Sequence, residues 1–280
     1  MQLTFLGTGT SSGIPSIGCQ CEVCRSPDPH NRRLRTSACL NFLDQTETPR
    51  TILIDAGPDL RQQALRAHMN RLDAILFTHH HVDHTFGLDE VRRFNVVMDS
   101  PIDIYADAHT LESLRRVYKH IFDQQSNIQK SFVASLIAHT IKAGEPFDLF
   151  GLRIFPLTLL HGRLPILGFR FDATWESTSP DSILPLAYCT DVSSIPPETW
   201  PRLTGLHTLV LDALRTKHHP THMTIDRAQE VAERIGARQT YFVHMSHDLD
   251  HAKTNAQLPD TMQLAYDTLT IGQQQNRTSQ

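Results

Sequence analysis

The stretch Thr78-His-His-His-Val-Asp-His-Thr85 crowds four side chains that can bind metal into six residues: His79, His81, Asp83 and His84. It follows directly on Ala74-Ile-Leu-Phe77, an apolar run typical of a buried strand. Imidazoles and a carboxylate suit zinc, manganese or iron, and ligands placed this closely can supply two ions from one turn. The chain has 17 histidines in 280 residues, so some clustering is expected. The order His-x-His-x-Asp-His after a strand nevertheless predicts a metal site and not a polar loop.

Short apolar runs bounded by turn residues predict strands along the whole chain. They cover residues 3–6, 51–54, 74–77, 102–105, 152–155, 167–171, 186–189, 208–211 and 240–243. Helical periodicity is clearest at 60–68, 88–97, 111–118 and 225–235, the last with Thr224 as a capping residue. We therefore expect an α/β protein.

Residues with metal-binding or acid–base groups recur directly after the predicted strands, or as their last residue. They are Asp55, His79, His161, Asp191, Asp212 and His244. Polar groups just past strand ends gather along one edge of a sheet, where the backbone is rigid and solvent can enter. One such histidine would be unremarkable, whereas six such endings are hard to explain by packing. The sequence predicts a site at this edge.

The segment Gly18-Cys-Gln-Cys-Glu-Val-Cys24 brings Cys19, Cys21 and Cys24 together. With Cys39 and Cys189 the chain has five cysteines, an odd number that favours an intracellular metal site over a disulfide framework. Three thiolates at this spacing can wrap one tetrahedral zinc, and His247 is the candidate fourth ligand. A redox cluster and three reduced structural thiols are the alternatives. We predict a structural zinc loop at 18–25.

The bulk properties narrow the class of protein. A chain of this length with 40% hydrophobic residues can bury one large core, and we expect a single domain at 1–272 with a disordered tail at 273–280. A net charge of −4 argues against a broad nucleic-acid surface. No apolar run reaches the roughly 18 residues that span a bilayer, and nothing resembles a signal peptide. We expect a cytoplasmic protein with no membrane contact.

With these residues in view, the chain resembles the metallo-β-lactamase superfamily. The match comprises the Gly7-Thr-Gly9 turn, Asp55, His79-x-His81-x-Asp83-His84, His161, Asp191 and His244. The resemblance implies an αββα sandwich with a two-metal site at one edge of the sheets. It assigns one ion to His79, His81 and His161, and the other to Asp83, His84 and His244. Asp191 would bridge the ions, and Asp55 would orient ligands from behind the site.

The cysteine loop, the segment Gly7-Thr-Gly-Thr-Ser-Ser-Gly-Ile-Pro15 and the pair His244-Met-Ser-His247 resemble the PhnP-like branch of the superfamily. This branch is that of the phosphoribosyl 1,2-cyclic phosphate phosphodiesterases, and the resemblance implies a homodimer. It gives catalytic roles to Asp83 and to His222, which would face the scissile phosphate. His218 and His219 lie close enough in the sequence to leave open which of the three histidines faces the substrate.

The resemblance implies a metal-dependent hydrolase, with a small and possibly cyclic phosphodiester as substrate. Two ions about 3.5–4 Å apart would convert a shared water into hydroxide that attacks phosphorus in line. His222 would protonate or stabilise the departing alkoxide. The expected cofactors are two divalent ions, zinc or manganese, and one structural zinc.

Other functions are open at this level. A lactonase or thioesterase can use the same two-metal core, and a non-catalytic metal-binding module can retain the fold, although such proteins tend to lose ligands. A tRNase Z-like nuclease would need a tRNA-holding arm that is not recognisable here. A PqqB-like protein would share the cysteine loop but depart from the histidine series. The densest positive cluster is Arg32, Arg33 and Arg35, where we expect a solvated loop in preference to a phosphate contact.

Overall fold

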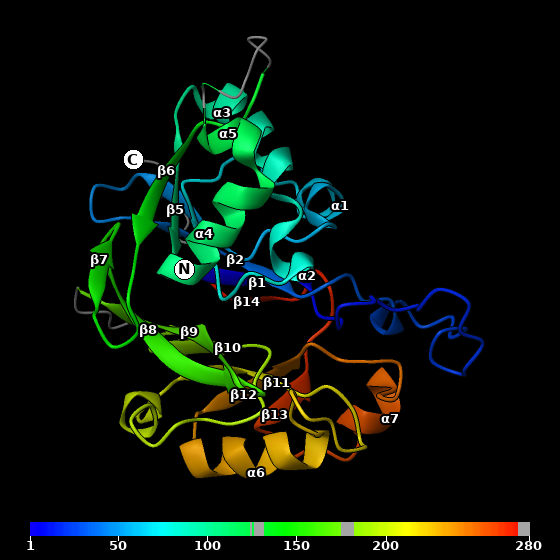
Figure 1. Ribbon diagram of the computed structural model, residues 1–280. Helices are drawn as coiled ribbons and strands as arrows, with labels where there is room; N and C mark the ends of the chain where they lie inside the picture. The colour runs from blue at the N-terminus through cyan, green and yellow to red at the C-terminus, as the bar shows by residue number, and fades with distance from the viewer. Residues whose placement is uncertain (124, 126–131, 175–181, 274–280) are drawn as a thin grey trace, which may run out of the picture.

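Helices cover the outer faces of two packed sheets in the computed structural model of the chain (Figure 1). The structure describes residues 1–123, 125, 132–174 and 182–273. Within them the strands form two sheets of seven, and the predicted αββα sandwich is confirmed. The tail predicted to be disordered, 273–280, lies outside the described residues except for Gln273. None of the described helices combines the length and the apolar character needed to cross a bilayer.

The first sheet carries the N-terminal half of the chain and one strand from its C-terminal end. In spatial order its strands are β14 (Thr270–Gly272), β1 (Gln2–Gly7), β2 (Ser37–Leu43), β3 (Pro49–Ile54), β4 (Ala74–Leu76), β5 (Ile102–Ala106) and β6 (Leu136–Thr140). Pairing is antiparallel from β14 to β3 and parallel from β3 to β6.

The second sheet is built from the C-terminal half. Its strands are β13 (Met262–Leu264), β12 (Gln239–Val243), β11 (Thr208–Asp212), β10 (Leu186–Cys189), β9 (Leu164–Ala173), β8 (Leu152–His161) and β7 (Phe147–Leu149). Strands β10 to β13 pair parallel, and β7 to β10 pair antiparallel.

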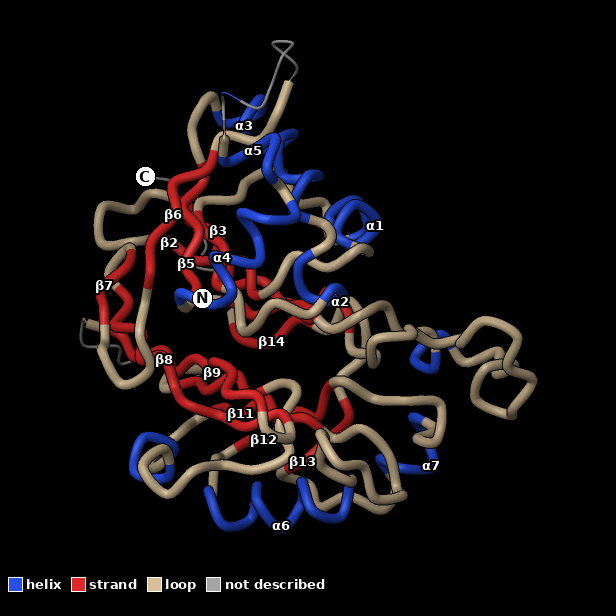
Figure 2. Tube along the Cα trace, in the orientation of Figure 1, coloured by secondary structure: helices blue, strands red, loops and turns tan. Residues whose placement is uncertain are grey.

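Five helices lie on the side of the first sheet and two on the side of the second, among the residues described (Figure 2). The first set is α1 (Leu60–Arg66), α2 (Val82–Thr85), α3 (Arg92–Met98), α4 (Ala108–Val117) and α5 (Lys119–Phe122). The second set is α6 (Ile225–Ile235) and α7 (His251–Asn255), and short 3-10 turns occur at η1 (Pro29–Asn31), η2 (Leu88–Val91) and η4 (Trp200–Leu203). The predicted helix at 225–235 is confirmed together with its cap, since Thr224 Oγ1 accepts a hydrogen bond from Arg227 N at 3.2 Å.

Alternate residues of facing strands fill the space between the sheets. Leu3 and Phe5 of β1 and Phe169 and Phe171 of β9 point into this core and are fully buried. Two further apolar clusters lie under the helices, one on each outer face. Each large side chain buried in this way contributes about 1.5–3 kcal/mol, so both sheets are firm supports for the residues at their edge.

Parallel pairing brings several strand ends to the same edge. Asp55 follows β3, Asp191 lies two residues past β10 and His244 follows β12. All three have left-handed backbone conformations, with φ of 61°, 59° and 61°. This conformation is uncommon outside glycine and costs of the order of 1–3 kcal/mol per residue, so it persists only where the surrounding structure enforces it. The three residues at this edge thus share one strained backbone conformation.

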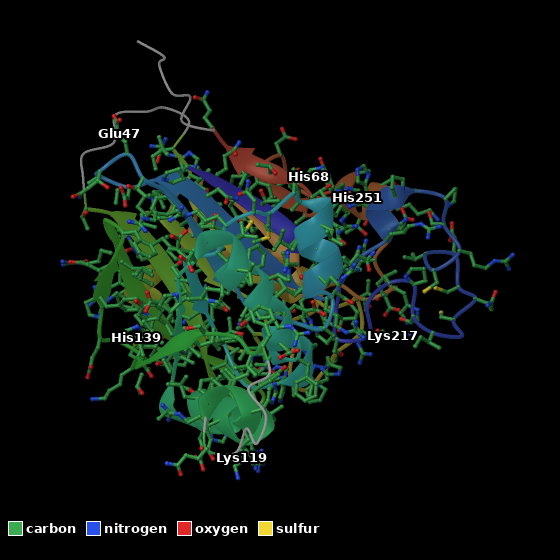
Figure 3. The ribbon with its side chains drawn as sticks, turned by 90° about the horizontal axis from the view of Figure 1, so that it is seen from above. Glu47, His68, Lys119, His139, Lys217 and His251 are labelled. Carbon is green, nitrogen blue, oxygen red and sulfur yellow. The ribbon has the colours of Figure 1, made fainter. Side chains whose placement is uncertain are left out.

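The positive cluster after the cysteine loop differs from the expectation. Arg33 is only 1% exposed, and it donates from Nη1 to the backbone oxygen of Ser246 at 2.9 Å and from Nη2 to that of Leu249 at 2.7 Å. The prediction of a solvated loop is therefore wrong for Arg33. The carbonyl groups of the turn after His244 need donors, and the guanidinium supplies them. In Figure 3 the loop between β1 and β2, which we call the N-terminal loop, extends away from the body of the protein, with His251 near its base.

Two glycines allow the loops that carry the site to approach one another. A Cβ at Gly57 would lie 2.1 Å from the backbone oxygen of Asp83, and one at Gly87 would lie 2.0 Å from the backbone oxygen of Gly57. The backbone N–H of Ala56 donates to the oxygen of His84 at 2.8 Å. The turn after β3 and helix α2 are thus locked together through contacts that only glycine permits.

We expect Gly57→Ala to lower the free energy of unfolding by about 1–3 kcal/mol, because overpacking forces the backbone apart. The same change should loosen the position of Asp83. Thermal or urea unfolding monitored by circular dichroism measures the effect. Gly205→Ala serves as the reference for backbone strain without crowding, since its φ is +68° and a Cβ there would meet no atom within 4 Å. A Gly57→Ala protein as stable as the wild type would show that close approach at Gly57 does not limit the backbone.

Candidate metal centre

Among the described residues, seven side chains at the sheet edge form two neighbouring groups that could each hold a metal ion. The ligand atoms within a group all lie within 4.8 Å of one another. One group comprises His79, His81 and His161, and the other comprises Asp83, His84, Asp191 and His244. The structure therefore brings together every residue that the family resemblance assigned to the two ions.

The first group joins the two sheets. His79 and His81 lie between β4 and α2, whereas His161 is the last residue of β8 in the opposite sheet. The ring centroids of His79 and His81 are 4.5 Å apart, and those of His81 and His161 are 5.2 Å apart. A cation among these three rings would tie one layer of the sandwich to the other.

Asp191 has a central place between the groups. Its Oδ2 lies 3.2 Å from His84 Nε2, and its Oδ1 lies 3.2 Å from His244 Nε2. A carboxylate oxygen of Asp191 also lies within 4.8 Å of a ring nitrogen of His161, which belongs to the first group. A carboxylate in this position can be shared by two cations and moderate the repulsion between them.

Hydrogen bonds behind the groups determine which nitrogen of each imidazole faces inward. Thr78 Oγ1 donates to Asp55 Oδ2 at 2.8 Å, so its lone pair is available to accept from His79 Nδ1 at 3.0 Å. His84 Nδ1 donates to the same Asp55 oxygen at 2.7 Å. With Nδ1 of both histidines engaged in this way, Nε2 is the ring nitrogen that faces the site.

The same logic applies to His161. Its Nδ1 donates to the backbone oxygen of Thr221 at 2.9 Å, which leaves Nε2 free to bind a cation. The Nε2 atoms of His79, His84 and His244 are buried and have no hydrogen-bond partner among the described residues. Buried polar atoms without partners are costly, so these nitrogens fit metal ligands better than structural side chains.

The charges of the second group also favour a bound metal ion. Burial alone would lower the pKa of His244, but the carboxylates of Asp191, Asp212 and Asp83 raise it to about 9. Despite the opposing effect of burial, His244 and His84 hold the pKa of Asp191 well below its usual range. Buried carboxylates that stay ionised require positive charge beside them, and a divalent cation supplies it. The residues thus fit the metal ions that the fold implies.

His222 forms a dyad with Asp212 at the mouth of the site. His222 Nδ1 donates to Asp212 Oδ2 at 2.7 Å, and the same oxygen accepts from Val192 N at 2.8 Å. The His222 ring stacks on that of His244 with 4.6 Å between centroids. Of the described residues, His222 lines the cavity before the metal groups, whereas His218 and His219 do not. Among the three histidines left open by the sequence, His222 is the one that faces the site.

The cysteine loop forms a separate group. The Sγ atoms of Cys19, Cys21 and Cys24 lie 3.0, 3.4 and 3.6 Å from His247 Nδ1. A sulfur and a nitrogen that share a tetrahedral zinc are about 3.5 Å apart, so the four atoms fit one ion. The backbone N–H of Cys24 lowers the pKa of the Cys21 thiol to about 7, whereas burial raises the pKa of the Cys24 thiol to about 11, so Cys21 is the first of these two to ionise.

A cavity of about 520 Å³ opens in front of the two metal groups. Its floor is formed by ligand residues from both groups, and its side is formed by α2 and α4. A second cavity, of about 770 Å³, lies over β1 to β3 and contains none of the ligand residues. Its arginines are engaged by carboxylates: Arg50 and Arg71 by Asp73, and Arg66 by Asp267. The chemistry therefore points to the smaller cavity.

Sequence reasoning missed some residues that shape the site. Thr78 begins the histidine stretch, and its hydroxyl orients His79. Asp212 was recognised at its strand end without its partner His222. A hydroxyl residue beside a ligand is a common sequence feature, so nothing in the sequence marks Thr78 for this task.

Comparison with known proteins gives consistent results. Residues 50–245 match the family model described as the Beta-lactamase superfamily domain. A crystal structure of a diphosphatase from the PhnP family is 41% identical and has a TM-score of 0.83, with 96% of each chain covered. Zinc-bound PqqB from Methylobacterium extorquens has the same fold, with 19% identity, a TM-score of 0.74 and coverage of 98% of this chain and 100% of that one.

An octanoyltransferase of Porphyromonas gingivalis is 36% identical over 96% of this chain. The chain spans about half, 51%, of the length of that protein. The match therefore concerns one part of a longer protein.

We expect Thr78→Val to weaken catalytic-site metal affinity by about 10–100-fold, because loss of the hydroxyl frees the His79 ring and leaves Asp55 with one donor fewer. Competition with a chromophoric chelator measures the affinity. Thr78→Ser retains the hydroxyl and is the matched control. Wild-type affinity in Thr78→Val would show that this hydrogen bond does not position the ligand.

We expect Cys21→Ser to lose one bound ion per chain and to make the N-terminal loop sensitive to protease, because the ion holds the loop to the segment that carries His247. Elemental analysis and limited proteolysis measure the two effects. Cys39→Ala, which changes a buried thiol outside the loop, should keep the ion. Unchanged metal content in Cys21→Ser would rule out the proposed site.

Proposed function

The chain belongs to the metallo-β-lactamase superfamily, in its PhnP-like branch, and from this premise we propose that it hydrolyses a small phosphodiester. The observation that supports the proposal most strongly is the pair of ligand groups around Asp191, opening into one cavity beside the His222–Asp212 dyad. Hydrolysis of a phosphodiester needs a nucleophilic water, neutralisation of phosphoryl charge and a proton for the departing oxygen. Each requirement has a residue or a residue group at this site.

Seven residues would hold the ions in this proposal. His79, His81 and His161 would bind one, and Asp83, His84 and His244 the other, with Asp191 between them. Two divalent cations bound there would make a shared water acidic and neutralise charge on the phosphoryl oxygens. Asp83 has its catalytic role through this binding.

His222 would move the proton. Because Asp212 accepts the Nδ1 proton at 2.7 Å, the other ring nitrogen, Nε2, is the one available to the substrate. In its protonated form His222 donates from Nε2 to the oxygen that leaves phosphorus, and Asp212 stabilises the positive charge of the ring. Val192 N holds Asp212 in place, so the ring keeps one orientation throughout.

A diphosphate is a second candidate for the scissile group. The PhnP-family relative with 41% identity is described as a diphosphatase. Each phosphorus of a disubstituted diphosphate carries one negative charge and one departing oxygen, as in a phosphodiester. The same ligand groups and the same proton donor therefore suit both reactions.

Other reactions have less support. The cavity of about 520 Å³ suits a small molecule, and one arginine lines it in the described part of the chain, which gives little electrostatic attraction for a tRNA. A non-catalytic metal-binding module would not need the His222–Asp212 dyad. A lactonase or thioesterase remains to be separated by assay.

The proposal also includes zinc or manganese as the catalytic ions and zinc in the cysteine loop. It includes a homodimer, which rests on the family resemblance, and a cytoplasmic location, which rests on the odd and clustered cysteines. The single domain at 1–272 and the ligand assignments belong to the same proposal.

We expect the zinc- or manganese-loaded protein to hydrolyse bis-p-nitrophenyl phosphate and to act weakly or not at all on a lactone and a thioester. His222→Ala should lower kcat on diphenyl phosphate by about 10²–10⁴-fold, because phenolate leaves poorly without a proton. The loss on bis-p-nitrophenyl phosphate should be smaller, since p-nitrophenolate needs no proton to leave. Asp212→Asn should show the same pattern more weakly.

His218→Ala is the matched control, because His218 is exposed and does not line the cavity in the described structure. It should keep wild-type kcat on both esters, and all variants should keep their metal. A preference for the lactone or the thioester over both phosphodiesters would contradict the proposed function. An equal loss on both esters in His222→Ala would contradict the role of His222 as proton donor.

A further inference from the structure

One wall of the cavity in front of the metal centre consists of residues that belong to neither ligand group. We call this surface the α2–α4 wall, and its members are Val82, Phe86, Ser113, Arg116 and Val117. A phosphodiester group alone is much smaller than a cavity of about 520 Å³, so the remaining space must accommodate the rest of the substrate.

The sequence of α4 builds one side of this wall. Leu111 and Leu114 are buried against the first sheet, whereas Ser113, Arg116 and Val117 lie at i, i+3 and i+4 and line the cavity. Tyr118, directly after the helix, donates from its buried hydroxyl to the backbone oxygen of Thr85 at 2.9 Å. This bond fixes α4 against α2, so the wall is rigid.

Three apolar side chains of the wall are left open. Val82 is 54% exposed, Phe86 is 48% exposed and Val117 is 46% exposed. They belong to two different helical segments but face the same cavity beside a polar metal centre. The Phe86 ring meets the Tyr118 ring edge-on with 6.5 Å between centroids, which holds its orientation. An apolar surface of this kind suits a planar ring of the substrate.

Arg116 adds a charge to the same wall. It is the one arginine or lysine that lines the cavity among the described residues, and no carboxylate of these residues forms an ion pair with it. Arg92, in contrast, is paired with Asp89 at 2.8 Å. An unpaired guanidinium at the side of a phosphate-cleaving site suits a second anionic group of the substrate.

We propose that the α2–α4 wall selects nucleotide-like substrates, with the planar base lying on Phe86 and Val117 and a second phosphate on Arg116. The inference rests on the proposed function, because it identifies the substrate class of that same site. A ribosyl phosphate without a base leaves the apolar part of the wall uncovered. An aryl phosphodiester has no second anionic group and therefore leaves Arg116 unpaired. A nucleotide that carries two phosphates satisfies both parts.

Calorimetric titration of the zinc-loaded full chain with adenosine 5′-diphosphate, adenosine 5′-monophosphate and ribose 5-phosphate tests the proposal. We expect affinity to fall in that order. Arg116→Ala should weaken binding of the diphosphate about tenfold, which is the usual effect of losing one charge-assisted hydrogen bond, and Arg116→Lys should recover part of the loss. Phe86→Ala should weaken the monophosphate several-fold and leave ribose 5-phosphate nearly unchanged.

Arg115→Ala is the matched control, because Arg115 is the adjacent exposed arginine of α4 and does not line the cavity in the described structure. It should change each dissociation constant by less than twofold. Equal weakening in Arg115→Ala and Arg116→Ala would overturn the proposal, since only the general charge of the helix would then matter. So would a Phe86→Ala variant that loses ribose 5-phosphate and the monophosphate to the same extent.

Hydrolysis of bis-p-nitrophenyl phosphate separates this inference from the proposed function. We expect the wild type and Arg115→Ala to hydrolyse that ester with kcat values within about threefold of each other, because Arg115 does not line the cavity in the described structure. An active wild-type enzyme whose diphosphate affinity does not depend on Arg116 would overturn the wall assignment alone. A wild-type protein that binds the nucleotides through Arg116 but hydrolyses no phosphodiester or diphosphate would overturn the proposed function instead.

Discussion

Asp55 is a fully buried carboxylate on which the geometry of both ligand groups depends. One oxygen, Oδ2, accepts from Thr78 Oγ1 and from His84 Nδ1, and the other accepts from Thr78 N at 2.8 Å. Through Thr78 the carboxylate reaches His79 in the first group, and directly it reaches His84 in the second. Burial raises the pKa of Asp55, and the charge of His84 and the hydrogen bonds from His84 and Thr78 offset this only in part. A single side chain thus sets the orientation of one imidazole in each group.

The sheets supply the rigidity that such an arrangement needs. Asp55, Asp191 and His244 each adopt a left-handed backbone turn at the end of a strand, and the packed core holds the strands in register. A buried cluster of carboxylates and imidazoles with unpartnered nitrogens would destabilise an isolated loop. The left-handed turns, the buried nitrogens without hydrogen-bond partners and the neighbouring charges of opposite sign all occur at the same edge. Such local costs in stability are expected at a binding site.

Much of this was predictable from the sequence, for specific physical reasons. Buried parallel strands read as continuous apolar runs, so β4, β10 and β11 were found close to their observed bounds. Strand β2 was missed, although Ala38, Leu40 and Phe42 alternate with Cys39 and Asn41 as in a half-buried strand. The predicted helix at 88–97 is divided into η2 and α3, since periodicity does not distinguish a 3-10 turn from an α-helix. The ligand residues were assigned from their spacing together with the family resemblance.

Tertiary contacts account for what the sequence did not reveal. The burial of Arg33 depends on carbonyl groups more than 200 positions away in the chain, so its neighbours Arg32 and Arg35 suggested a solvated cluster. The contact between Thr78 and Asp55 spans 23 residues, and the α2–α4 wall requires two helices to meet.

The central claim is that two neighbouring cations share Asp191. Anomalous X-ray diffraction of the metal-loaded protein tests it most directly: we expect two peaks about 4 Å apart on either side of Asp191 and a third among the cysteines. A single peak at the sheet edge, or peaks away from these residues, would contradict the account.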